Sequence, residues 1–379
     1  MEPIALKIQR RRYSKAAVFE ISIHRLVRRE TGSCDEIVAL HEAFLHDGHV
    51  CMAFEKHGQS LDDALGSRPL PIARVRRITR ELLLALERLH RCGYAHTDVK
   101  PDNILYNPST GDARLADLGS ADNELREGST FGTRGYIAPE VIIGAPLTTA
   151  VDVWSLGCTV FEMLTGRRLF NPRRAAAKKY REFSSDEDAI EVPLAGTVTA
   201  DEAAEEAEQF SPGAIIGGKY ALESVLGRGR YGTVWAARPL HQTRLDDSYD
   251  TLWSHAQSIP SSADSEHDPR DREWRHARGA DDILDLTLNY EHLLQIAALR
   301  GPVPVEMVRA ACYRGGYFEE DGTLRFRPKI RSCPLSIRLG RVAHPDAQAC
   351  DFLESILTVN STARPSVSRA LEHPWLREE

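Results

Sequence analysis

The segment YAHTDVKPDNIL, residues 94–105, constrains the fold and chemistry of this chain more than any other part of the sequence. It follows a long helical pattern that ends in a glycine, and it leads into a short apolar run typical of a strand. A carboxylate (Asp98), an amine (Lys100) and an amide (Asn103) lie close together on this loop. Phosphoryl transfer requires a carboxylate that accepts the proton of the attacking hydroxyl, a lysine near the phosphate, and oxygens that hold Mg²⁺. The loop therefore predicts phosphoryl-transfer chemistry.

Three further motifs accompany this loop. Asp117 in ADLGSA comes at the predicted end of a strand, where a second carboxylate can bind Mg²⁺, and the segment GTRGYIAPE occupies residues 132–140. Upstream, Lys7 lies on a predicted strand and Glu20 on the helix that follows it. Taken alone, a strand lysine is usually a solvated edge residue, and an Asp-x-Gly is usually a turn. Their order and spacing around the loop at 94–105 argue against coincidence.

These motifs together resemble those of eukaryotic protein kinases. HTDVKPDNIL is similar to the catalytic loop, ADLG to the metal-binding motif, IAPE to the end of the activation segment, and IALK to the strand with the ATP-binding lysine. The spellings HTD and DLG, with HVCMAFE, RPLPIARV and LEHPWL, resemble the SR-protein kinases of the CMGC group. The resemblance covers nearly all of residues 1–173 and 283–379. It implies an α+β, two-lobed kinase-like fold with a small β-rich N-lobe and a large helical C-lobe.

The resemblance also implies a role for each matching residue. Asp98 would be the catalytic base, Lys100 would steady the γ-phosphate, and Asn103 and Asp117 would bind Mg²⁺. The residues implied to bind ATP are Lys7, Glu20, Glu55, His57, Gly227, Gly229, Gly232 and Val234. Supporting roles are implied for Phe54 as gatekeeper, for Thr133 beside Asp98 and Lys100, and for a pair between Glu140 and Arg364. The cofactors implied are ATP and Mg²⁺.

Two positions depart from the common kinase pattern. Thr97 replaces the arginine that usually couples activity to a phosphorylated activation loop, which favours an enzyme that is not switched in that way. Ile137 stands where CMGC kinases usually carry arginine, so a strict preference for Arg-Ser repeats does not carry over.

The glycine-rich segment LGRGRYGTVWAA, residues 226–237, lies in an unexpected place. Its pattern is that of a phosphate-binding loop, which in a kinase precedes the lysine strand, yet here it follows the motifs at 94–140. The linkers on either side of a hairpin at 218–238 are long and flexible enough for it to complete the N-lobe in the same molecule or in a neighbouring one, as a swapped dimer. Alternatively, the order reflects an incorrectly assembled gene product, and the hairpin does not dock.

Composition divides the chain further. Residues 182–208 are acidic and residues 241–282 are polar, and both segments are predicted to be flexible linkers. The expected organisation is an N-lobe part at 1–57, a first C-lobe part at 58–173, a mostly flexible and partly disordered insert at 174–282 that carries the hairpin, and the C-lobe remainder at 283–379.

The overall composition narrows the possible partners and location. A net charge of −7 does not suggest a nucleic-acid-binding protein, so no direct nucleic-acid partner is expected. No stretch approaches the roughly 20 apolar residues of a membrane span, so no membrane partner is expected. The seven cysteines are scattered without metal-ligand spacing, which favours reduced thiols in the cytoplasm or nucleus.

Two hypotheses of different classes follow. The first is a serine/threonine protein kinase that uses Mg-ATP on protein substrates, with Arg/Ser-rich proteins as a candidate class that the acidic run at 182–208 would dock. The second is a catalytically impaired pseudokinase or scaffold, which the displaced glycine loop favours. The intact set of Asp98, Lys100, Asn103 and Asp117 favours the enzyme.

Overall fold

The computed structural model describes residues 3–32, 34–172, 210–229, 231–241, 249–258, 286–325, 334–340 and 346–377. The chain divides into two units. The first, the sheet unit, takes residues from 1–58, 117–119 and 194–275, and the second, the helical unit, takes residues from 59–116, 120–193 and 276–379. Within the described ranges, no helix is both long and apolar enough to cross a membrane.

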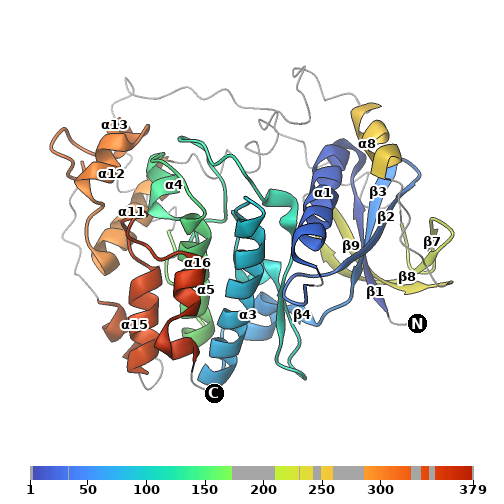
Figure 1. Ribbon diagram of the computed structural model, residues 1–379, viewed down its shortest axis with the longest axis horizontal. Coiled ribbons are helices and arrows are strands. Elements are labelled where there is room, and N and C mark those ends of the chain that lie inside the picture. The colour runs from blue at the N-terminus through green and yellow to red at the C-terminus, as the bar shows by residue number, and fades with distance from the viewer. Residues whose placement is uncertain are drawn as a thin grey trace. The chain divides into compact units, whose positions relative to one another are not determined.

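The sheet unit contains one six-stranded antiparallel sheet. Its strands are β1 (Ile4–Gln9), β2 (Leu40–His46), β3 (His49–Glu55), β7 (Ile215–Ile216), β8 (Tyr220–Arg228) and β9 (Gly232–Pro239). Their order in the sheet is β2-β3-β1-β9-β8-β7, so the hairpin of β8 and β9 extends the sheet along β1. Figure 1 shows this yellow hairpin beside the blue strand β1, although the two are far apart in the sequence.

The displaced hairpin therefore pairs with the lysine strand of the same chain. The register places Val234 of β9 opposite Lys7 of β1, and Gly227 of β8 opposite Val234. Apolar side chains on one side of the sheet are buried together, and Leu222 and Trp235 of the hairpin are among them. Full burial of such a side chain contributes roughly 1.5–3 kcal/mol, which offsets the entropy of closing the long connections to the hairpin. The buried cluster consists of Ile4, Leu6, Ile8, Phe44, Cys51, Ala53, Ile216, Tyr220, Leu222, Trp235 and Ala237.

Two helices accompany the sheet. Helix α1 (Ser14–Thr31) follows β1, and its buried residues recur at helical spacing, as the sequence pattern predicts. Helix α8 (Tyr249–Ser258) packs against α1 and β2. Leu252 and Ala256, four residues apart and hence on one face of α8, are almost fully buried.

Helix α8 corrects one expectation from the sequence. Residues 241–282 are predicted to be a flexible linker because the segment is polar, but Tyr249–Ser258 are helical. Two buried apolar side chains on one face suffice for a ten-residue helix when a partner surface is present, and composition does not reveal that surface. The predicted linker at 182–208, and the predicted disorder of much of the insert at 174–282, lie outside the described residues.

The helical unit is built around two long helices. Helix α3 (Ile72–Arg91) buries one apolar face, whereas every residue of α5 (Ala150–Thr165) except the first is buried, as expected from its nearly continuous apolar sequence. The other helices are α2 (Leu61–Leu65), α4 (Pro139–Ile143), α11 (Leu286–Arg300), α12 (Val305–Ala310), α13 (Arg314–Tyr317), α14 (Leu335–Gly340), α15 (Ala347–Ile356) and α16 (Val367–Leu371). A small sheet of β4 (Gln59–Ser60), β5 (Ile104–Tyr106) and β6 (Ala113–Leu115) flanks the loop at 94–105.

The close approach of β9 to β1 can be tested at a glycine. A Cβ atom at Gly232 would lie 2.2 Å from the backbone oxygen of Ile8, whereas a Cβ at Gly227 would meet nothing within 4 Å. We expect Gly232→Ala to destabilise the sheet unit by about 1–3 kcal/mol, as overpacking does, and Gly227→Ala to change its stability far less. Hydrogen exchange of the amides of β1 and β9 measures this difference. Equal protection in the two variants would contradict the observed pairing.

Burial of His24 in α1 predicts a pH dependence of stability. Burial, reinforced by the charge of Lys7 and opposed by Asp117, lowers the pKa of His24 to about 3. The unfolded chain binds a proton at this residue below about pH 6.5, and the folded chain does not until about pH 3, so stability falls as the pH decreases through that window. From pH 7.5 to 5 we expect the loss at this site to be about 2 kcal/mol.

The check is hydrogen exchange of α1 measured across this pH range. His24→Gln should flatten the dependence, whereas His41→Gln, a change at an exposed histidine of β2, should not. An unchanged slope in His24→Gln would show that this residue does not cause it.

Candidate active site

The loop at 94–105 is anchored by one buried carboxylate. Asp152 of α5 accepts hydrogen bonds from the backbone nitrogens of His96 (2.7 Å) and Thr97 (2.8 Å), and its Oδ2 lies 2.8 Å from Nε2 of His90. Thr97 has a φ of +70°, which is uncommon for a β-branched residue and costs on the order of 1–3 kcal/mol. The bonds from Asp152 hold the backbone in this conformation. As a result, the chain turns sharply just before Asp98.

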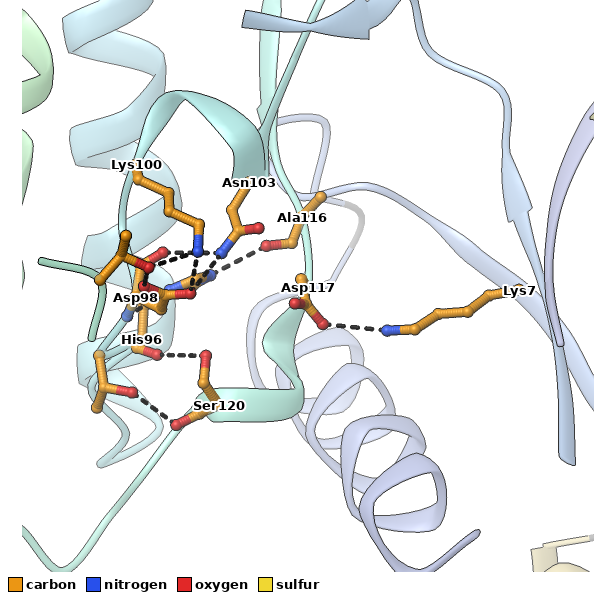
Figure 2. A network of polar contacts seen from close by, with 10 residues as sticks. Lys7, His96, Asp98, Lys100, Asn103, Ala116, Asp117 and Ser120 are labelled. Carbon is orange, nitrogen blue, oxygen red and sulfur yellow. Dashed lines mark hydrogen bonds and ion pairs between the residues drawn. The ribbon is translucent and has the colours of Figure 1, made fainter. Parts of the chain in front are cut away.

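Asp98 lies at the centre of a network of polar contacts. Its Oδ2 accepts hydrogen bonds from Lys100 Nζ at 2.7 Å and from Asn103 Nδ2 at 3.1 Å. Its Oδ1 accepts one from the Thr133 hydroxyl at 2.7 Å, and Lys100 also donates to that hydroxyl at 2.6 Å. Figure 2 shows the side chains of Lys100 and Asn103 pointing toward Asp98. The structure thus brings together the three predicted catalytic residues and the predicted supporting residue Thr133.

His96 orients the same loop through its ring. Its Nε2 lies 3.0 Å from the backbone oxygen of Ala116, which can only accept, so Nε2 carries the proton. Its Nδ1 is then free to accept a hydrogen bond from the backbone nitrogen of Asp98 at 3.2 Å. The ring therefore links the backbone at Asp98 to the end of strand β6.

The segment from Ser120 to Glu140 is held by hydrogen bonds at Ser120 and Gly128 and by an ion pair at Glu140. Thr97 donates through its hydroxyl to the Ser120 oxygen at 2.7 Å, and Tyr313 donates to the Gly128 oxygen at 2.6 Å. Glu140 forms the predicted pair with Arg364, with contacts of 2.6 and 2.9 Å between fully buried side chains. Ile137 is buried. Thr97, which replaces an arginine in the common pattern, thus donates a hydrogen bond from its hydroxyl directly to this segment, at the backbone oxygen of Ser120.

Lys7 in the sheet unit is held between two carboxylates. Its Nζ lies 2.7 Å from Glu20 Oε2 and 3.0 Å from Asp117 Oδ1. Burial by itself lowers the pKa of Lys7, but the charges of Asp117 and Glu20 outweigh it and raise this pKa above its ordinary value. Lys7 therefore stays charged at all physiological pH values. Figure 2 shows its side chain extended toward Asp117.

The predicted glycine loop lies at the tip of the hairpin. Gly227 is at the end of β8 and Gly232 begins β9, and the backbone nitrogen of Gly229 donates to the Gly232 oxygen at 2.9 Å. Val234 lies opposite Lys7 in the ladder, so the structure brings the phosphate-loop residues and the predicted ATP lysine together on adjacent strands.

The predicted adenine-binding segment lies at the end of β3. Glu55 is the last residue of this strand, and its backbone nitrogen donates to the Ala39 oxygen at 3.0 Å. His57 is buried two residues later. The ring of the predicted gatekeeper Phe54 packs against the ring of His24, with centroids 5.4 Å apart.

The side chains present suit a nucleotide and a divalent cation. Asn103 uses its Nδ2 to contact Asp98, which leaves its amide oxygen as the atom that would bind Mg²⁺. Asp117 has one oxygen on Lys7 and a side chain 39% exposed, so its carboxylate is accessible to a cation. Asp117 belongs to the sheet unit and Asn103 to the helical unit. Oxygen ligands of this kind are those that Mg²⁺ prefers, and the charged Lys7 beside Asp117 suits phosphate oxygens.

Several contacts between polar side chains were not predicted from the sequence. Glu42 of β2 contacts Lys219 and Tyr220, which lie 177 and 178 positions away, and no local pattern connects residues so distant. Asp152 lies in the segment VDVWS, residues 151–155, but its bonds to the loop at 94–105 depend on the packing of α5 and do not follow from the sequence pattern. Burial raises the pKa values of Asp62 and Glu162, and the charge of Asp102 adds to both effects, although the three residues lie on separate elements.

The sequence is similar to those of known protein kinases. Residues 3–216 match the family model described as Protein kinase domain. The chain is 35% identical over 166 residues to the serine/threonine-protein kinase prp4 of Schizosaccharomyces pombe, a match that covers 42% of this chain and 35% of that protein. It is 36% identical over 179 residues to homeodomain-interacting protein kinase 2 of Mus musculus, covering 45% of this chain and 15% of that protein.

The chain thus spans about a third or less of the length of these curated relatives. The matched family region contains the catalytic loop, the DLG motif and the APE motif, and it ends just before strand β8 begins. The resemblance to kinases and the α+β kinase fold expected from the sequence are confirmed. The chain belongs to the protein kinase family.

Proposed function

We propose that this protein is a serine/threonine protein kinase that transfers the γ-phosphate of Mg-ATP to hydroxyl groups of protein substrates. The observation that supports it most directly is Asp98, a carboxylate whose two oxygens are positioned by Lys100, Asn103 and Thr133. A carboxylate fixed in this way can receive the proton of a substrate hydroxyl. A lysine next to it can stabilise charge on a transferred phosphoryl group.

In the proposed reaction the substrate oxygen forms a bond to the γ-phosphorus, and the bond from that phosphorus to the bridging oxygen breaks. The hydroxyl proton passes to Asp98, and ADP leaves with the bonding electrons. When bound, Mg²⁺ would neutralise phosphate charge, with Asp117 and Asn103 as its proposed ligands. Lys7, kept in place by Glu20, would orient the nucleotide phosphates.

The remaining site residues are proposed in supporting roles. Glu55 and His57 would contact adenine through their backbone, and Val234 would pack on the base. Gly227, Gly229 and Gly232 would let the backbone approach the phosphates, because a glycine carries no Cβ that would block the approach.

The scaffold alternative depended on a glycine loop that is out of reach of the site. The pairing of β9 with β1 in the same chain weakens that argument, because Val234 lies directly across from Lys7. The order of the segments in the sequence therefore does not by itself prevent completion of the nucleotide site.

A basic substrate is favoured by the charges near the catalytic loop. Asp62, Asp102 and Glu162 are close enough for their charges to interact, and Arg168 is the cation that they share. Burial raises the pKa of Glu162, and the charges of Asp62 and Asp102 add to that effect. An additional guanidinium from a substrate would relieve this repulsion. We therefore propose Arg/Ser-rich proteins as the substrate class.

The first test is the transfer of labelled γ-phosphate to an Arg/Ser-rich protein. We expect Asp98→Asn to lower kcat by a factor of about 10² to 10⁴, the usual contribution of a general base. Deletion of 218–240 should also abolish transfer, because it removes the phosphate loop. Asp351→Asn, which alters a carboxylate that is 79% exposed on α15, should leave the rate unchanged.

If the intact chain transfers no more phosphate than Asp98→Asn, the enzyme proposal is wrong. Mg-dependent ATP binding without transfer would then support a scaffold.

We propose the cytoplasm or the nucleus as the location, because reduced thiols persist in those compartments and the cysteines are scattered along the sequence.

The substrate preference has its own test. We expect Asp102→Asn to raise the KM for an Arg/Ser peptide by roughly two- to fivefold, the range of a partly exposed ion pair. The KM for a peptide with glutamine in place of arginine should change little in this variant. An equal change for both peptides would count against recognition of arginine by this cluster.

A further inference from the structure

The hairpin of β8 and β9 has a second attachment to the sheet unit, at its base. Lys219 lies immediately before β8 and Tyr220 begins it, and both contact Glu42 of strand β2. Lys219 Nζ lies 2.7 Å from Glu42 Oε2, and the Tyr220 hydroxyl donates a hydrogen bond to Glu42 Oε1. The Glu42 side chain is only 1% exposed. Both of its oxygens therefore bind groups that come from the insert.

Aromatic contacts join the same part of the insert to strands β2 and β3. The ring of Phe44 on β2 stacks on that of Tyr220, with centroids 5.9 Å apart. Gly217 approaches the same phenylalanine so closely that a Cβ there would lie 2.5 Å from it. Phe210, before β7, packs against the ring of His49 at 5.4 Å. Residues 210–220 are thus joined to β2 and β3 by apolar contacts as well as by charge.

The position of these contacts in the sheet gives them a specific consequence. Strands β2 and β8 are not neighbours, since β3, β1 and β9 lie between them in the sheet order. A contact between them requires the sheet to curl, so that its two ends meet. The contact at Glu42 is therefore separate from the β9–β1 ladder, and it holds the root of the hairpin while the ladder holds its second strand.

A buried carboxylate of this kind is selective for what it binds. An uncompensated charge at Glu42 would be costly to bury, so the strand favours a segment that presents both an amine and a hydroxyl. Consecutive residues Lys219 and Tyr220 present those two groups. The hairpin begins at this point and reaches its glycines at Gly227 and Gly232.

We propose that Glu42 is a positioning residue that fastens the insert hairpin through Lys219 and Tyr220, and so holds the phosphate loop beside Lys7. The expected effect on ATP rests on the kinase activity proposed above, whereas the effect on docking does not. Loss of the contact frees the root of the hairpin and weakens ATP binding. It leaves the network around Asp98 unaltered.

The test uses the full chain with three substitutions. Glu42→Gln removes the charge, and Tyr220→Phe removes one hydroxyl while keeping the ring on Phe44. Glu223→Gln is the matched control, because it makes the same chemical change on the same hairpin at a side chain 48% exposed, 3.9 Å from Arg238. Hydrogen exchange of the β9 amides reports docking, and steady-state kinetics separate KM for ATP from kcat.

We expect Glu42→Gln to speed exchange in β9 by roughly tenfold or more, and Tyr220→Phe by roughly two- to tenfold, as for charged and neutral hydrogen bonds. Glu223→Gln should exchange as the unaltered protein does. KM for ATP should rise several-fold in the first two variants, with kcat at saturating ATP within about twofold, because ground-state binding is what is lost.

Unchanged exchange of β9 in Glu42→Gln would overturn the proposal. If exchange in that variant rises equally across β2, β3 and α1, the whole sheet unit has unfolded, and Tyr220→Phe then decides. Normal β9 exchange in Tyr220→Phe would in that case reject the role of the contact. If the unaltered chain transfers no phosphate, the kinase proposal fails, and the exchange data still decide whether Glu42 docks the hairpin.

Discussion

The ladder between strands β1 and β9 is the constraint on which the rest of the sheet unit depends. It carries Lys7 on one strand and Val234 on the other, and it completes a buried cluster to which both parts of the chain contribute. Without β9, strand β1 would be an exposed edge with unpaired backbone groups and an incomplete apolar face. With it, the lysine strand becomes an interior strand of a six-stranded sheet.

The charged side chains of Lys7 and Asp98 are held in place by different kinds of contact. Lys7 is held by two full charges, and its burial would be unfavourable without both of them. Asp98 is held by one ion pair, with Lys100, and by neutral hydrogen bonds from an amide and a hydroxyl, on a loop whose backbone donates to Asp152. The second arrangement fixes both carboxylate oxygens in place, which suits the proposed role of Asp98 as a general base.

The contrast between local and distant contacts explains how much the sequence could predict. Asp98, Lys100 and Asn103 lie within six positions of one another, so their spacing alone indicates a shared loop, and the fold follows from motifs in a known order. The strands at 4–9 and 49–55 and the helices at 72–91 and 150–165 also agree with the apolar pattern. These features depend on neighbours along the chain.

The features that the sequence did not predict depend on partners that are distant in the chain. The sequence of β2 does not distinguish Glu42 from other polar residues, because its partners Lys219 and Tyr220 are far away along the chain. Helix α8 carries too few apolar residues to be distinguished from a linker without the surface of α1. Whether the hairpin pairs with β1 was likewise open, because flexible connections allowed docking in the same molecule, in a neighbour or not at all.

The arrangement of the sheet also sets an order of events during synthesis. Strands β1, β2 and β3 are made first, yet β9, the second strand that pairs with β1, ends only at Pro239, after the loop at 94–105 and helix α5 have been made. At typical rates of chain elongation, β1 waits on the order of ten seconds for β9. During that time its edge is open to other strands, and loop closure over so long a separation is slow. The six-stranded sheet is therefore completed only after helices α3 and α5 have been made, and helices α11 to α16 of the helical unit are made later still.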